Sequence, residues 1–269
     1  MKALRIVAAI LIFTIIAGYS VLSNSPSIQM LGVISASIVG ALISVAYEMI
    51  DTHGQGFGTW LKSKILYRNK DIYLSFSYLY KIEVEGKYLL IKGHRMPNRY
   101  QPIGGVYKFY PEARSFLNKI KYVPDTMVGN NDETDDLRIS IKAKYLLDFY
   151  DWFLKMENRE YDPTREFYEE LISPGLLPEE KFRHLHYRKV HVHNVGITKS
   201  VVPGRKPEVI YADIFEVTLN DEQKRLVKNA VNGSSSSLCL ASPDEMASLH
   251  LNGSVEINLG NNTPWLIEE

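Results

Sequence analysis

The sequence of 269 residues contains one cysteine, Cys239, and no excess of either charge, because 31 lysines and arginines balance 31 acidic residues. A single cysteine excludes an intrachain disulfide and any zinc site built on cysteine pairs. A neutral balance provides no polybasic footprint, so we expect no stable nucleic-acid partner. The chain also lacks internal repeats and long low-complexity tracts. These absences agree with a globular region that faces the cytoplasm.

Apolar residues are concentrated near the N-terminus in two runs, Ile6 to Leu22 and Met30 to Ile50, separated by the polar stretch Ser23 to Gln29. Each run approaches the length that crosses a hydrocarbon core of ~30 Å. A secretory signal peptide is an alternative for the first run, because Lys2 and Arg5 precede it. The second run favours an uncleaved transmembrane hairpin over residues 1–50 instead.

Basic residues predict the orientation of this hairpin. Two of them precede the first run, the connecting stretch contains none, and Lys62, Lys64, Arg68 and Lys70 follow the second run. By the positive-inside rule, both termini and the soluble region face the cytoplasm. Residues 51–70 are then a juxtamembrane linker, and 71–269 form one domain of ordinary size.

Small residues recur every fourth position in the second run, at Gly32, Ala36, Gly40 and Ser44. In lipid, such spacing lets helix backbones approach closely and drives association by packing. We therefore expect a helix–helix interface and, with it, a homo-oligomer in the bilayer. Whether the contact lies within one hairpin or between subunits is left open by the sequence.

An acidic run, Arg165 to Glu170, follows the helix-start signal Asp162-Pro163. In a helix, Glu166, Glu169 and Glu170 stand at i, i+3 and i+4, which places them on one face. Crowded carboxylates suit Mg²⁺ or Mn²⁺, which relieve their repulsion and bridge to phosphate oxygens. The alternative is an acidic, solvated helix face.

The wider spacing resembles the second half of the Nudix box, with Glu157, seven residues, and then Arg-Glu-hydrophobic-x-Glu-Glu from Arg165. The expected glycine position before it is Asp151, and the final box glycine is missing. The glycine half lies upstream instead, as Gly104-Gly105, after a strand-turn-strand pattern. The resemblance implies an α/β fold, a Nudix-like α/β/α sandwich with a mixed sheet, whose box is split by an insertion at about 106–153.

Coarse patterning agrees with that fold. We expect strands near 72–84, 88–92, 105–110, 137–141, 184–193 and 210–218, and helices near 112–119, 143–155, 165–171, 221–229 and 242–246.

The same resemblance assigns roles to site residues. Glu166, Glu169 and Glu170 are the expected metal ligands, and Glu157 is a further ligand or a water-orienting base. Arg165 holds the carboxylates through a salt bridge. The glycine pair, Gly104 and Gly105, together with Arg95 and Arg99, is expected to bind the phosphates of the ligand; a basic hairpin tip is the alternative for the two arginines.

A Nudix domain on a two-helix anchor resembles the SMODS-associated Nudix effectors of bacterial cyclic-oligonucleotide anti-phage signalling. That resemblance implies a receptor in the bacterial inner membrane, which senses a cyclic nucleotide made by a neighbouring nucleotidyltransferase and then disrupts the lipid bilayer. Cyclic oligonucleotides offer separated phosphodiesters and no diphosphate to cleave. The alternative is a membrane-tethered Nudix hydrolase of nucleoside diphosphate derivatives.

Overall fold

The computed structural model describes residues 2–23, 25–51, 59, 61–93, 98–125, 135–200, 204–233, 237–254, 256 and 258–268. The chain divides into two compact units, Met1–Arg68 and Asn69–Glu269.

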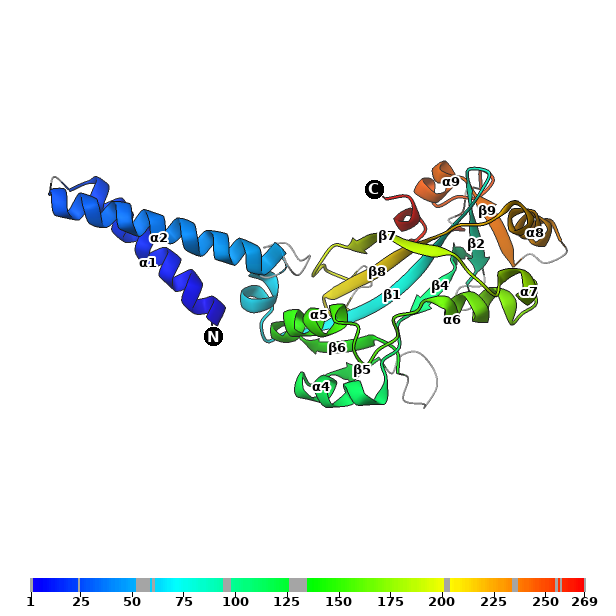
Figure 1. The fold of residues 1–269 in the computed structure, drawn as a ribbon, viewed down its shortest axis with the longest axis horizontal. Helices are drawn as coiled ribbons and strands as arrows, with labels where there is room; N and C mark the ends of the chain where they lie inside the picture. The colour runs from blue at the N-terminus through cyan, green and yellow to red at the C-terminus, as the bar shows by residue number, and fades with distance from the viewer. Residues whose placement is uncertain are drawn as a thin grey trace. The chain divides into compact units, whose positions relative to one another are not determined.

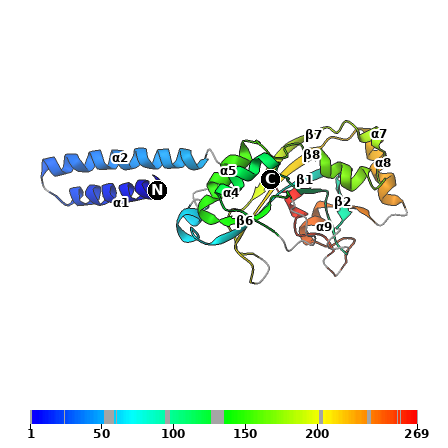
Figure 2. The ribbon, with the colours of Figure 1, turned by 90° about the horizontal axis from the view of Figure 1, so that it is seen from below.

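The first unit is a pair of helices, α1 (Lys2–Val21) of 20 residues and α2 (Pro26–Asp51) of 26 residues. They lie side by side and are joined by a short connection (Figure 2). Proline suits the start of α2, because its missing N–H is not needed there. A π-helical turn, η1 (Lys62–Leu66), comes later in this unit. Within the described residues, none of the helices combines the length and the hydropathy that spanning a bilayer requires. The transmembrane assignment therefore stays a prediction.

The small residues of α2 do not form a single contact face. Gly32 is buried, and a Cβ there would lie 1.7 Å from the Ser20 hydroxyl oxygen of α1. Gly40 has nothing within 4 Å of such a Cβ, and Ala36 and Ser44 are exposed. A four-residue repeat drifts by about 40° at each step around an α-helix, because one turn takes about 3.6 residues. The stripe therefore turns away from α1 after Gly32.

The second unit is built on the long strand β1 (Asp71–Val84). It pairs in parallel with β8 (Glu208–Val217) and antiparallel with β6 (Arg138–Lys142) and then β4 (Gly104–Val106). Antiparallel strands β7 (Tyr187–Asn194) and β5 (Val123–Pro124) extend the sheet beyond β8 and β6. Figure 1 shows this arrangement, which is the predicted mixed sheet.

The far end of β1 belongs to a second antiparallel group. Strand β2 (Lys87–Lys92) pairs with the end of β1, with β3 (Tyr100–Pro102) and with β9 (Leu238–Ala241). Cys239 lies buried in β9, and burial raises the pKa of its thiol to about 12.

Short helices surround the strands, and most lie where the sequence pattern places them. Helix α9 (Pro243–Ser248) lies where a helix near 242–246 is predicted, and the capping box of Ser242 and Glu245 begins it. The helical segments are η2 (Pro111–Ala113), α4 (Arg114–Lys119), η3 (Ala143–Tyr145), α5 (Leu146–Leu154), α6 (Thr164–Phe167), η4 (Tyr168–Ile172), α7 (Glu179–Phe182), α8 (Asp221–Asn232), α9 (Pro243–Ser248) and η5 (Pro264–Leu266).

Aromatic side chains fill the core between β1, β8 and α5. Phe76 stacks on Tyr211 with ring centroids 4.8 Å apart, and Phe149 and Phe153 of α5 pack edge-on against Phe76. The residues between the two halves of the split box therefore supply a core helix and the strand β6. They are an integral part of the domain.

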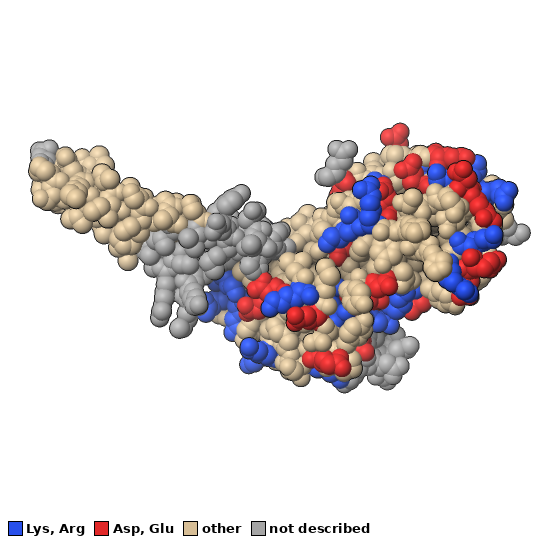
Figure 3. Space-filling model, viewed as in Figure 1, with Lys and Arg blue, Asp and Glu red and all other residues tan. Residues whose placement is uncertain are grey.

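Charged side chains are interspersed on the outside. On the face in Figure 3, acidic and basic residues are interspersed over the second unit. A mixed surface of this kind provides no broad field for a polyanion.

Candidate functional site

The acidic run forms one continuous helical stretch, α6 followed by η4, as predicted. The Asp162 carboxylate accepts a hydrogen bond from the Thr164 backbone N–H at 2.9 Å, which satisfies a free donor at the helix start. The second half is a π-helical turn, closed by the Ser173 N–H on the Tyr168 carbonyl. Turns of this kind recur at functional sites.

The three box glutamates differ in environment. The side chain of Glu166 is 16 % exposed and that of Glu169 is 54 % exposed, whereas Glu170 is a buried residue. The three glutamates therefore do not share one acidic face, as an α-helix would predict, because Glu169 points toward solvent.

The glycine pair meets the acidic helix in space. The Gly104 N–H donates to Glu170 Oε2 at 2.9 Å, although 66 residues separate them. Gly104 has φ +140, and a Cβ there would lie 2.2 Å from the Tyr78 carbonyl oxygen. At Gly105 a Cβ would lie 1.9 Å from Glu166 Oε1. Both positions need glycine because the helix and β1 approach the backbone of β4 so closely.

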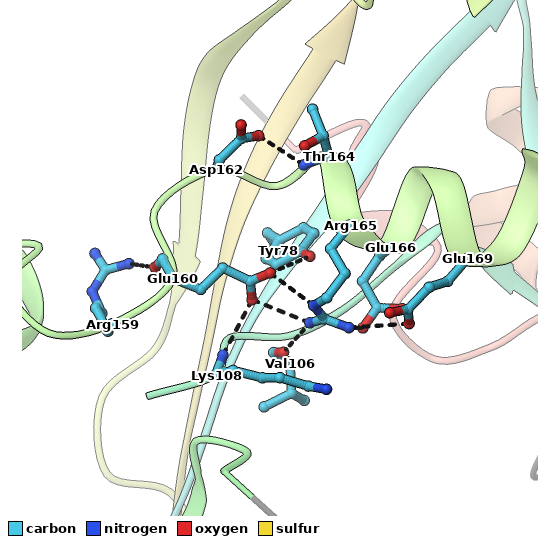
Figure 4. A network of polar contacts seen from close by, with 10 residues as sticks. All are labelled: Tyr78, Val106, Lys108, Arg159, Glu160, Asp162, Thr164, Arg165, Glu166 and Glu169. Atoms are coloured by element: carbon cyan, nitrogen blue, oxygen red, sulfur yellow. Dashed lines mark hydrogen bonds and ion pairs between the residues drawn. The ribbon is translucent and has the colours of Figure 1, made fainter. Parts of the chain in front are cut away.

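Arg165 joins three segments of the chain (Figure 4). Its Nε and Nη2 donate to the two carboxylate oxygens of Glu160, at 2.8 and 3.1 Å. Nη2 also donates to the Val106 carbonyl at 3.0 Å. Nη1 donates to Glu166 at 2.6 Å and to Glu169 at 3.2 Å. A guanidinium carries five N–H donors, so these contacts use all of them. Arg165 is therefore a positioning residue.

Glu160 is a site residue that the spacing of the box does not identify. It is buried and accepts the Lys108 backbone N–H at 3.1 Å in addition to the two bonds from Arg165. Glu157, which the box spacing selects, is exposed and lies outside this network in the part of the chain that is described. Glu157 is selected because it lies eight positions before Arg165, as the box requires. No local sequence pattern distinguishes Glu160.

Of the two arginines that are expected to bind phosphate, the structure describes only Arg99. Arg95 lies outside the described residues. Arg99 is partly exposed, and its carbonyl accepts the Gly93 N–H at 2.8 Å to close the hairpin. Within the described contacts, no hydrogen bond or ion pair joins the Arg99 side chain to α6 or η4.

Burial controls the electrostatics of the acidic helix. The pKa of Glu170 is raised to about 8, chiefly by burial; the Gly104 N–H opposes this shift, and the nearby Glu166 and Glu169 charges add to it. Burial also raises the pKa of Glu166, against the lowering effect of Arg165. Glu170 is therefore mostly protonated near neutral pH.

Carboxylate oxygens have the right chemistry for Mg²⁺ or Mn²⁺, but their arrangement does not fit a preformed site. The Arg165 Nη1 lies between Glu166 and Glu169, where a cation would bind. Glu170 is bonded to Gly104 and retains its proton. Across the described ranges, no three His, Cys, Asp or Glu side chains gather to hold an ion.

A mixed sheet with a glycine pair against an acidic helix defines a Nudix-like domain. Residues 71–267 match the family described as SMODS-associated NUDIX domain, and the chain belongs to that family. Among curated proteins and among solved structures, the comparison found no match.

Proposed function

We propose that this protein is a membrane-anchored effector of a bacterial anti-phage defence system. Its Nudix-like domain binds a cyclic nucleotide made by a neighbouring nucleotidyltransferase. The two N-terminal helices, placed in the inner membrane with both termini in the cytoplasm, then disrupt the bilayer and cause abortive infection. Membership of the SMODS-associated NUDIX family supports the defence context.

We favour binding over hydrolysis because all five N–H donors of Arg165 are engaged in hydrogen bonds within the fold. Glu166 and Glu169 share that guanidinium, and Glu170 is buried with a raised pKa. The charge of the acidic helix is thus largely compensated by the protein itself. A domain with such a helix is suited to stable binding, whereas hydrolysis needs carboxylates that are free to hold a cation.

A second candidate is hydrolysis of nucleoside diphosphate derivatives with Mg²⁺ or Mn²⁺. The observation that favours it is the meeting of Gly104 and Gly105 with Glu170 and Glu166, which joins the two halves of the box. In this case, Glu166, Glu169 and Glu170 would hold the cation, which would require Glu169 to be released from Arg165.

The full-length protein in detergent distinguishes the two candidates. Calorimetric titration with a panel of cyclic di- and trinucleotides measures binding, and mononucleotide release from a panel of nucleoside diphosphate derivatives with Mg²⁺ or Mn²⁺ measures hydrolysis. We expect binding of at least one cyclic nucleotide and no turnover. A turnover near ~10 s⁻¹, which is ordinary for enzymes, without binding of any cyclic nucleotide would reject the effector proposal.

A further inference from the structure

A hollow of about 540 Å³ lies between the acidic helix and α7. We call it the α6–α7 hollow. Its volume falls within the range of ~300–1,000 Å³ that is typical of small-molecule sites. The apolar lining comes from Phe167 and Ile172 on one side and from Phe182 and Leu185 on the other. Phe167 and Phe182 are buried, with ring centroids 5.9 Å apart, so this lining is fixed by the core.

The rim of the hollow presents an aromatic ring and a cation. Tyr168 is 48 % exposed, and Arg183 is exposed at the end of α7. Arg165 also lines the hollow, but its donors are all used within the fold. Among the described contacts, Arg183 makes no hydrogen bond or ion pair. It is therefore the lining arginine with a full guanidinium available for an incoming anion.

Acceptors complete the rim. Glu179 is exposed, makes no described ion pair and lies one helical turn before Arg183. The Glu169 carboxylate retains one oxygen that does not contact Arg165. A ligand for this lining combines a flat apolar ring, N–H groups for the carboxylates and an anion for the arginine. Rings stack on exposed aromatic side chains, and a guanidinium binds a phosphate through two parallel N–H bonds.

We propose that the α6–α7 hollow binds one nucleotide unit of the ligand. The base stacks on Tyr168 with its N–H edge toward Glu169 and Glu179, and the phosphate binds Arg183. This assignment rests on the proposed function and specifies the place where the cyclic nucleotide binds. The acidic helix lines the hollow and also contacts Gly104 and Gly105, so a bound base contacts the same helix as the glycine pair.

Photolabelling tests the site without knowledge of the natural ligand. Full-length protein in detergent is irradiated with 8-azidoadenosine 5′-monophosphate, and the modified peptides are mapped. We expect label within residues 161–185, and competition by unlabelled AMP and by any cyclic nucleotide that binds. Tyr168→Ala and Arg183→Glu should each reduce labelling and cyclic nucleotide affinity by roughly tenfold to a hundredfold, as expected when a stacking ring is truncated.

Matched controls come from the same domain. Tyr110 is 44 % exposed, and Arg225 is exposed on α8, and neither lines the hollow. Tyr110→Ala and Arg225→Glu should leave labelling unchanged. Thermal unfolding of all four variants shows whether a loss comes from misfolding. Because Tyr168 and Arg183 are exposed, their variants should unfold near the wild-type temperature.

The outcomes separate this site from the proposed function. If the wild type binds a cyclic nucleotide and Tyr168→Ala and Arg183→Glu do not weaken this binding, the α6–α7 hollow is not the ligand site. The sensor role is then unaffected. Labelling in the hollow, without binding of any cyclic nucleotide, supports the site and contradicts the sensor role. Absence of specific label, or label outside residues 161–185, overturns the hollow.

Discussion

The Glu166 carboxylate occupies the space that a side chain at position 105 would need. A Cβ on Gly105 would lie 1.9 Å from Glu166 Oε1, and that carboxylate is held by Arg165 at 2.6 Å. The glycine and the glutamate are therefore coupled, because the helix keeps its position only while residue 105 has no side chain. This contact joins the two halves of the split motif.

The loss of stability caused by replacing a glycine with alanine should depend on which atoms the new Cβ contacts. Gly104→Ala places a Cβ 2.2 Å from the Tyr78 carbonyl at φ +140, so backbone must move, and we expect a loss of about 3 kcal/mol or more. Gly105→Ala meets a side chain that can shift, and we expect about 1–3 kcal/mol. Gly233→Ala is the control, because its nearest atoms lie at 3.4 and 3.5 Å. Denaturant unfolding measures all three; equal losses at 104 and 233 contradict the geometry.

A lysine at position 165 (Arg165→Lys) should not stabilise the fold as Arg165 does. Lysine lacks the planar fork that reaches Glu160, Val106 and Glu166 together, and Glu160 would remain buried without its partner. We expect a loss of about 3–5 kcal/mol in unfolding free energy, as for a broken buried pair. Arg188→Lys is the control, because the Arg188 side chain is 73 % exposed in its pair with Glu216 and should lose at most about 1 kcal/mol. Equal losses in both variants would show that Arg165 has no special role.

Stability should fall as pH rises through the titration of Glu170. Its folded pKa of about 8 lies above the ordinary value of 4.5, so the folded state binds more protons between these values. The contribution is complete below about pH 4.5 and is lost as pH rises through 8. Glu170→Gln removes this dependence, and the wild-type loss relative to the variant should be on the order of 2–4 kcal/mol between pH 5 and 9. Parallel denaturation profiles for wild type and Glu170→Gln would refute this, and Glu169→Gln is the exposed control.

Paired glutamine substitutions test the hydrolase candidate. Glu169→Gln with Glu170→Gln removes negative charge and keeps side-chain volume nearly constant. If the protein hydrolyses nucleoside diphosphate derivatives, mononucleotide release should fall by at least ~10²-fold, the scale for loss of a catalytic electrostatic group. If wild type shows no turnover and the double variant loses toxicity in cells, the carboxylates serve binding or folding.

Gly40→Ile tests association of the N-terminal helices. Gly40 has open space around it in the helix pair, so the substitution leaves the contact between α1 and α2 intact and blocks close approach by another helix. We expect nucleotide binding to survive and ligand-induced dye entry into cells to be lost. Gly32→Ile is unsuitable, because Gly32 packs against Ser20 within the pair. Gly18→Ile on α1 is the control with equal space around it. Unchanged dye entry in Gly40→Ile would show that this face does not mediate association.

The sequence by itself determined the local features of this protein. The apolar runs, the helix starts at Asp162-Pro163 and Ser242-Pro243, and the acidic stretch from Arg165 depend on neighbours a few residues apart. The box spacing was sufficient to indicate the family. These features can be predicted because each depends on residues that are close together in the sequence.

Only the tertiary structure decided which of these residues meet. The register of β1 with β4 brings Gly104 to Glu170, and the path of the loop before α6 places Glu160, not Glu157, against Arg165. Counting along a motif cannot detect such contacts, because they depend on where a folded segment passes in space. Which member of the small-residue stripe meets α1 is decided in the same way: Gly32 packs against Ser20 and Gly40 has open space, because of where α1 lies beside α2.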